Sequence, residues 1–140
     1  MNEQELRQAM STLEVFRAQL ESIAENQQLI QLSLEELGRA RETLSQYQKA
    51  TEGSELLVPV GGNSFVFAKV ASNTKAIVGI GTGVSVEKTM EDAIQTMDDR
   101  AKELVDTMKK LTDRRMTIEE QANQLSQAVQ QEIQTIQQRG

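Results

Sequence analysis

The chain has 140 residues and a net charge of −6, with 15 basic and 21 acidic side chains. The absence of cysteine and histidine removes the usual zinc ligands, thiolate nucleophiles and imidazole bases, and the negative charge disfavours nucleic acid as a partner. Aromatic residues make up 3% of the chain, fewer than a globular core of this size normally uses. We therefore expect a protein that is not an enzyme and that holds no metal ion or cofactor.

Apolar residues recur with heptad spacing from Leu6 and predict one helix over residues 1–50. A heptad pattern of this length indicates a left-handed coiled coil rather than a helix on a globular core. The two lines of its seam are Leu6, Leu13, Leu20, Gln27, Leu34 and Arg41, and Ala9, Phe16, Ile23, Ile30, Leu37 and Leu44.

Residues 54–88 contain four short β-type runs and predict two consecutive hairpins. Runs 56–60 and 64–70 flank Gly61, Gly62 and Asn63, and runs 76–80 and 84–88 flank the turn at 81–83. Glycines 79, 81 and 83 could instead suggest a phosphate-binding loop. We reject that alternative, because a β-type run rather than a helix follows them and no Gly-Lys-Ser or Gly-Lys-Thr is present.

A second heptad helix is expected over residues 89–139, where Thr89 and Asp92 resemble an N-cap with its capping box. Its seam consists of Ile94, Ala101, Met108, Arg115, Ala122, Val129 and Ile136, and of Met90, Met97, Leu104, Leu111, Ile118, Leu125 and Glu132. Two helices of similar length fold back most economically as an antiparallel intramolecular coiled coil, so the fold class is mainly α. The polar seam residues Gln27, Arg41 and Arg115 either fix the register or extend to solvent.

Two isolated hairpins bury little apolar area, and their strand edges would present unpaired backbone groups. We therefore expect neighbouring subunits to complete the β structure. The residues expected to make these oligomerisation contacts are Leu56, Val58, Val60, Phe65, Phe67, Ile77, Val84 and Val86.

The order of helix, LVPVGGNSFVFAKV hairpin, IVGIGTGVSVEK hairpin and helix resembles the α-class subunit of prefoldin (GimC), of the archaeal type. The resemblance implies a hexamer of two α and four β subunits, in which the hairpins form an intersubunit β-barrel platform. It also implies that the coiled coils hold unfolded client proteins at their tips without ATP and pass them to a group II chaperonin.

A protein-holding function requires accessible apolar side chains at the helix ends, where several subunits can reach one client. The expected client-binding residues are Leu6, Met10, Leu13, Val15, Phe16, Val129, Ile133 and Ile136. The alternative is that these residues only close the end of the coiled coil. The polar N-terminus and the absence of a membrane-length apolar run lead us to expect a cytoplasmic protein without a membrane partner.

Two other functions remain as alternatives. A self-assembling, filament-forming prefoldin homologue built from one subunit type would have the same sequence features. An enzyme acting through the glycine turn is the third possibility, and binding of ATP or GTP would support it.

Overall fold

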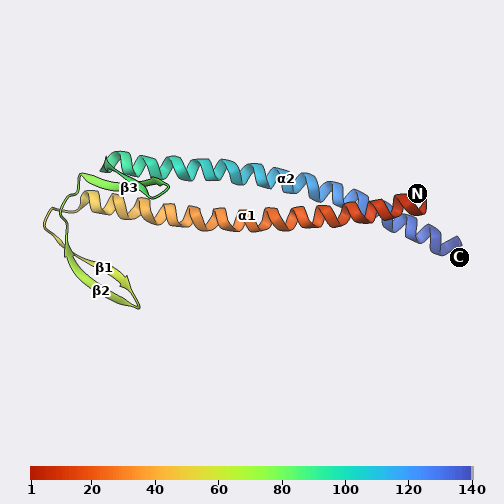
Figure 1. The fold of residues 1–140 in the computed structure, drawn as a ribbon, viewed down its shortest axis with the longest axis horizontal. Helices are drawn as coiled ribbons and strands as arrows, with labels where there is room; N and C mark the ends of the chain where they lie inside the picture. The colour runs from red at the N-terminus through yellow and green to blue at the C-terminus, as the bar shows by residue number, and fades with distance from the viewer. Residues whose placement is uncertain (140) are drawn as a thin grey trace. The chain divides into compact units, whose positions relative to one another are not determined.

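The computed structural model describes residues 1–139, which form two long helices separated by two β-hairpins (Figure 1). The expected mainly α fold is therefore observed. The elements are α1 (Glu3–Lys49), β1 (Glu55–Gly61), β2 (Ser64–Lys69), β3 (Lys75–Gly81), β4 (Val84–Thr89) and α2 (Met90–Arg139). The chain divides into two units, of which the first joins residues 1–32 to the part of α2 from Val105 onward, and the second is Ser33–Leu104.

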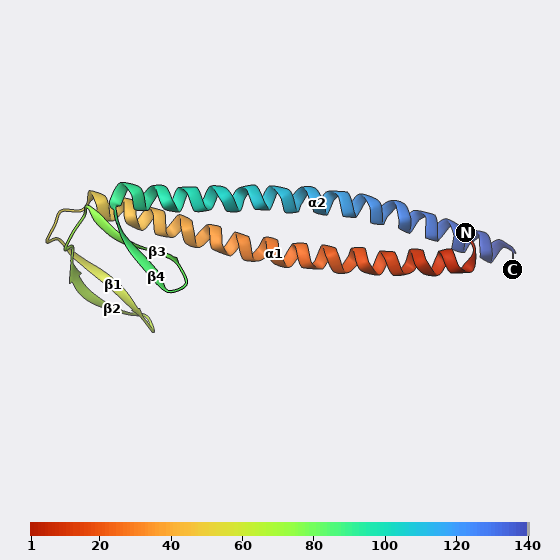
Figure 2. The ribbon, with the colours of Figure 1, turned by 45° about the horizontal axis from the view of Figure 1, so that its top comes forward.

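In the first unit, α1 and α2 lie side by side and antiparallel (Figures 1 and 2). The predicted seam is confirmed here, because its residues are the ones removed from solvent. Ala9, Ile23, Ile118 and Val129 are buried. Leu6, Leu13, Phe16, Leu20, Ile30, Met108, Leu111, Ala122 and Leu125 are half-buried.

Ile136 departs from the predicted seam, because half of its surface is exposed. The amino group of Met1, which precedes α1, lies 3.3 Å from a carboxylate oxygen of Glu132, so the start of the chain contacts α2 one turn before Ile136. The C-terminal end of α2 extends beyond the N-terminal end of α1 (Figure 2).

A polar cluster interrupts the seam of the first unit. The amide nitrogen of Gln27 donates to the Thr112 hydroxyl at 3.1 Å, and Arg115 Nη1 donates to the amide oxygen of Gln27 at 3.2 Å. Arg115 Nε is buried without a hydrogen-bond partner, and the nearest Glu119 oxygen is 3.6 Å away. Gln27 and Arg115 are therefore held inside the seam.

The second unit has its core where the β3–β4 hairpin packs against both helices. Val78, Ala93 and Met97 form a buried cluster, and Leu37, Ala40, Leu44 and Ala76 pack against it. Arg100 of α2 also donates to the backbone carbonyl of Gly79. This chain's own helices thus cover one face of β3–β4, which the sequence did not indicate. Completion of the strand edges by neighbouring subunits stays a prediction.

Arg41 does not occupy the seam position that the heptad count gave it. It is exposed and forms an ion pair with Asp98 at 2.6 Å, while its neighbour Ala40 contacts the hairpin-covered core. A short side chain at position 40 leaves room for β3, whereas a guanidinium there would have to lose its hydration.

The two hairpins repeat each other at an offset of 20 residues. β1 pairs with β2 and β3 with β4, and each hairpin has a register irregularity just before its turn, at Pro59/Gly61 and Gly79/Gly81. Gly61 and Gly81 have φ angles of 100° and 101°, and the two central residues of both turns also have positive φ. This geometry matches the primed turns that suit the twist of a hairpin and explains the glycine-rich turns.

The starts of both helices are capped. The Thr89 hydroxyl accepts from the Asp92 N–H at 3.2 Å, as predicted, and the Met90 N–H reaches the Thr74 carbonyl at 2.8 Å. At the start of α1, the Glu5 N–H donates to the side-chain oxygen of Asn2 at 2.8 Å, and the Asn2 N–H donates to the Glu5 carboxylate at 3.3 Å. The sequence analysis missed this second cap, although Asn followed three residues later by Glu is its usual signal.

Candidate functional site

The β1–β2 hairpin is apolar on both faces, and neither face is covered by the rest of the chain. Cross-strand partners share a face, so Leu57 and Phe67 lie on one side, and Val58 and Val66 on the other. Phe67 is 78% exposed, the largest value among the large apolar side chains of the described residues. Such side chains are unfavourable in water unless another surface covers them.

The expected oligomerisation residues therefore do not form a single surface. Leu56 and Val58 lie on one face of the β1–β2 hairpin and Phe65 and Phe67 on the other, while Val60 lies at the register irregularity. Sequence reasoning also missed Leu57 and Val66, which are 55% and 47% exposed. Strict alternation along both strands would have assigned these two residues to opposite faces.

The β3–β4 hairpin differs, because it offers only a narrow apolar surface to a partner. Ile77 is 68% exposed on the face away from the helices, where its cross-strand neighbour is Glu87. Val84 and Val86 lie on the same side of β4. Val84, near the turn, is half exposed, and Val86 is half-buried. Most of the uncovered apolar surface of the two hairpins thus belongs to β1–β2.

All four strands keep one unpaired edge within this chain. β1 pairs only with β2 and β3 only with β4 in two separate sheets of two strands each. An unpaired edge presents free N–H and C=O groups that another strand can pair with. The hairpins therefore offer both backbone edges and apolar side chains to another chain.

The second candidate surface is the tip, which consists of residues 1–16, including the start of α1, and of residues 125–139 of α2. Gln27 lies level with Thr112. The helices are antiparallel, so equal numbers of residues are counted toward the tip on each helix. Seventeen residues from Gln27 lead to Met10, and seventeen from Thr112 lead to Val129, so Met10 lies level with Val129. Val129 is buried, while Met10 and Ile133 are 51% and 38% exposed. Leu6, Leu13 and Phe16 are half-buried in the seam.

Val15 does not join the other expected tip residues. It is 53% exposed, but five residues separate it from Met10, which is a rotation of about 140° around an α-helix. Its side chain therefore points away from the side that carries Met10. The structure brings Met10, Ile133 and the seam residues toward one end, and it leaves Val15 on another face.

A shallow groove runs beside Phe16. It is lined by Phe16 of α1 and by Gln121, Gln124, Leu125 and Ala128 of α2. The groove combines an aromatic ring and aliphatic carbon with two amides, which can donate and accept hydrogen bonds.

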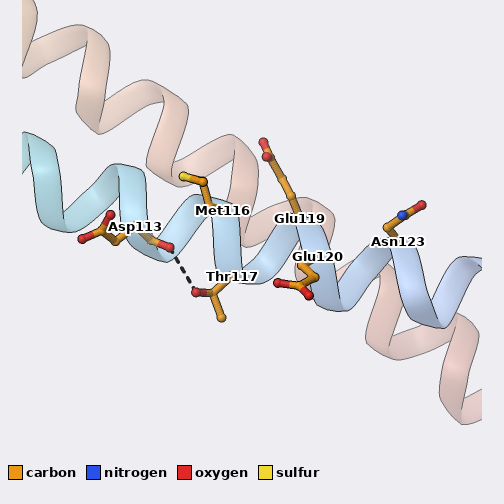
Figure 3. A pocket seen from close by; sticks show the side chains of 6 residues that line it. All are labelled: Asp113, Met116, Thr117, Glu119, Glu120 and Asn123. Atoms are coloured by element: carbon orange, nitrogen blue, oxygen red, sulfur yellow. Dashed lines mark hydrogen bonds between the residues drawn. The ribbon is translucent and has the colours of Figure 1, made fainter.

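Figure 3 shows a further surface hollow on α2, around Met116. Asp113, Glu119 and Glu120 surround this exposed methionine, and the Thr117 hydroxyl donates to the Asp113 carbonyl at 3.1 Å. All its lining residues belong to one helix, so it is a surface depression without a second wall. Its ionisable groups are the carboxylates of Asp113, Glu119 and Glu120, and no basic side chain is among its lining residues.

The described residues contain no group of His, Cys, Asp or Glu side chains that could hold a metal ion. Within residues 1–139, neither α1 nor α2 has a segment that is apolar enough over sufficient length to span a membrane.

Comparison with known proteins assigns the family. The model of the prefoldin subunit family matches residues 16–135, so the chain belongs to the prefoldin family. Prefoldin subunit alpha of Methanothrix thermoacetophila is 38% identical over 66% of this chain, that of Methanopyrus kandleri 41% over 67%, and that of Pyrococcus horikoshii 35% over 66%. The matched regions span 61%, 62% and 64% of the length of these relatives.

Solved structures show the same fold. A chain of the filamentous prefoldin from Methanocaldococcus jannaschii superposes with a TM-score of 0.60 and 25% identity, over 92% of this chain and 98% of that one. The prefoldin beta subunit from Thermococcus strain KS-1 gives a TM-score of 0.59 at 16% identity, over 91% and 90%. The archaeal α-subunit relatives confirm the resemblance to α-class prefoldin of the archaeal type, and the solved structures confirm the fold.

Proposed function

We propose that this chain is the α-type subunit of a cytoplasmic, ATP-independent co-chaperone that holds unfolded proteins and delivers them to a group II chaperonin. Family membership supports a co-chaperone role rather than an enzymatic one. The observation that carries the proposal is the uncovered β1–β2 hairpin, because a chain with Phe67 78% exposed needs partner subunits.

The proposed assembly contains two α and four β subunits joined through the hairpins. Covering one large apolar side chain contributes about 1.5–3 kcal/mol, so burial of Leu57, Phe65 and Phe67 supplies a substantial part of the assembly energy. The unpaired edges of β1 to β4 supply backbone hydrogen bonds in addition. Since β1–β2 is apolar on both faces, we expect partner chains to cover it from two sides.

The proposed client contacts lie at the tips. Met10 and Ile133 are exposed there beside the half-buried Leu6, Leu13 and Phe16. Methionine adapts its unbranched side chain to irregular surfaces, which suits unfolded clients of varied sequence. Several weak tip contacts acting together hold a client by avidity, and each can be released when a chaperonin competes for it.

The function is tested by co-expressing this chain with a β-class prefoldin subunit. Native mass spectrometry should give a two-to-four complex, and this complex should suppress aggregation of a chemically unfolded protein without nucleotide. Addition of ATP should change nothing. A stable lone monomer that does not bind the β-class subunit, or a complex that gives no protection, would refute the proposal.

A structural, filament-forming role is the second candidate. It is favoured by the filamentous prefoldin from Methanocaldococcus jannaschii, whose fold and 25% sequence identity extend over 92% of this chain. Electron microscopy of the purified chain without a β-class subunit separates the two functions. Long polymers would support the filament, and small discrete oligomers would support the hexamer.

A further inference from the structure

A second line of residues with heptad spacing runs along α1, away from the seam. We call it the outer stripe, and it consists of Val15, Ala18, Ser22, Glu25, Leu29 and Leu32. All six are exposed, and the exposed fractions of Val15, Leu29 and Leu32 are 53%, 63% and 56%. With about 100° of rotation per residue, this line lies on the side of the helix opposite to the seam.

Leucine is not required at these positions for the helix pair itself. In a two-stranded coiled coil, the positions opposite the seam face water and are normally polar. Single exposed apolar residues are common, but here they form two apolar pairs on one face, Leu29 with Leu32 and Val15 with Ala18, and the polar residues Ser22 and Glu25 lie between the pairs. The outer stripe therefore has the spacing that packs against another helix.

The charge on either side of the outer stripe is unequal. One border carries Glu14 and Glu21, and the opposite border carries the uncharged Thr12, Gln19 and Asn26. Glu21 lies 3.7 Å from Arg17 in an exposed pair. The carboxylates of Glu14 and Glu25 take part in no ion pair or side-chain hydrogen bond within residues 1–139, and both are exposed.

We propose that the outer stripe docks an amphipathic helical segment of another protein, with leucine-type residues at heptad spacing and Lys or Arg along one border. Apolar residues of that segment cover Leu29, Leu32 and Val15, and its cations lie opposite Glu14, Glu21 and Glu25. This is a helix-on-helix form of peptide recognition. It is separate from the proposed client contact at the tip, because Met10 and Ile133 are not part of it.

Charge selects this occupant over a second copy of the chain. A copy presenting its own outer stripe would bring three more glutamates to a surface that already has three, and like charges across an interface are unfavourable. A basic border on the docked helix instead lies opposite Glu14 and Glu25, which form no ion pair within the described residues, and opposite Glu21, whose pair with Arg17 is solvent-exposed. The contact area is small, so we expect a dissociation constant on the order of 10 μM.

The test uses the full-length chain and a fluorescein-labelled peptide of about 20 residues. The peptide has leucine at heptad positions and lysine along one border, and a control peptide has glutamate in place of each lysine. Fluorescence anisotropy should detect binding of the lysine peptide alone, and the affinity should fall as salt is raised, because salt screens exposed charges. Equal binding of the glutamate peptide would overturn the charge argument.

Three variants locate the site. Leu29→Gln combined with Leu32→Gln should weaken lysine-peptide binding at least tenfold, and Glu14→Gln combined with Glu25→Gln should weaken it about threefold and reduce its salt dependence. Met116→Gln is the matched control, since Met116 is 59% exposed on α2, and it should change nothing. Circular dichroism confirms that each variant keeps its helices.

Two results would overturn the proposal. One is unchanged lysine-peptide binding in the Leu29→Gln, Leu32→Gln variant. The other is self-association of the chain, measured by sedimentation, that this variant abolishes, because the occupant would then be a second copy. Substitution of Met10 and Ile133 should leave peptide binding intact. The proposal of peptide docking on the outer stripe and the proposal of client binding at the tip can therefore be tested independently.

Discussion

At the scale of single residues, the polar cluster of Gln27, Thr112 and Arg115 is the clearest departure from an apolar seam. Arg115 Nη1 is satisfied by Gln27, but its Nε is buried without a hydrogen bond. An unsatisfied buried donor lowers stability, whereas a polar pair that matches in one register disfavours alternative pairings of the helices. We therefore expect this cluster to lower the stability of the helix pair while favouring one register.

We expect the double variant Gln27→Leu, Arg115→Leu to be more stable than the natural chain by about 1–3 kcal/mol, because packed leucines replace an incompletely satisfied polar cluster. Urea unfolding followed by circular dichroism measures the change. Arg114→Leu, at the exposed neighbouring position, is the matched control and should alter stability little. A less stable double variant would mean that the hydrogen bonds contribute more than the apolar packing can replace.

At the scale of secondary-structure elements, the two hairpins share register and turn geometry but differ in their surroundings. Val58 and Val78 occupy equivalent positions in the 20-residue repeat, yet Val58 is 36% exposed and Val78 only 4%. The difference arises because α1 and α2 cover β3–β4 through Ala93, Met97 and Leu44. One hairpin is therefore anchored to its own helices, and the other is left for partner chains.

Substitution on the two faces of β3 should separate folding from assembly. Val78→Asp places a carboxylate in the buried cluster and should destabilise the chain by about 3 kcal/mol or more. Ile77→Asp, one residue earlier on the exposed face, should change chain stability by less than about 0.5 kcal/mol and instead weaken association with a β-class subunit. Urea unfolding and native mass spectrometry give the two readouts.

The opposite pattern would contradict this assignment. If Ile77→Asp destabilised the isolated chain as much as Val78→Asp, the outer face of the hairpin would have to be covered within the chain. If Ile77→Asp left assembly intact, β3–β4 would contribute to subunit contacts only through its strand edges.

At the scale of the whole molecule, the proposed function separates assembly from client holding. The uncovered hairpin residues belong to one unit, and the tip residues belong to the other. A substitution at the tip should therefore leave assembly unaffected. Deletion of residues 1–10 and 130–140 is the coarse version of this test, and side-chain substitution is the sharper one.

We expect Met10→Ser combined with Ile133→Ser to keep the hexamer intact and to reduce suppression of aggregation severalfold, because the accessible apolar area at the tip falls. Light scattering of an aggregating client measures protection, and native mass spectrometry confirms assembly. Met116→Ser removes a methionine outside the tip that is 59% exposed, against 51% for Met10, and should keep full protection. Full protection by the tip variant would show that clients bind elsewhere.

The sequence by itself determined the elements and their order. Heptad spacing predicted both helices, glycine-rich turns predicted both hairpins, and Thr89 marked the start of α2, because each of these signals depends on local backbone geometry and on side-chain periodicity. The same periodicity placed Ala9, Ile23, Ile118 and Val129 in the seam, where they are buried.

Only the tertiary structure decided which of the equivalent surfaces are covered. It removed Arg41 and Ile136 from the seam, and it gave the β3–β4 hairpin a packed face while β1–β2 stayed uncovered. Heptad counting reports which side of a helix a residue lies on, but it does not report what else packs there. Coverage depends on contacts between segments far apart in the chain, and such contacts leave no local periodic signal.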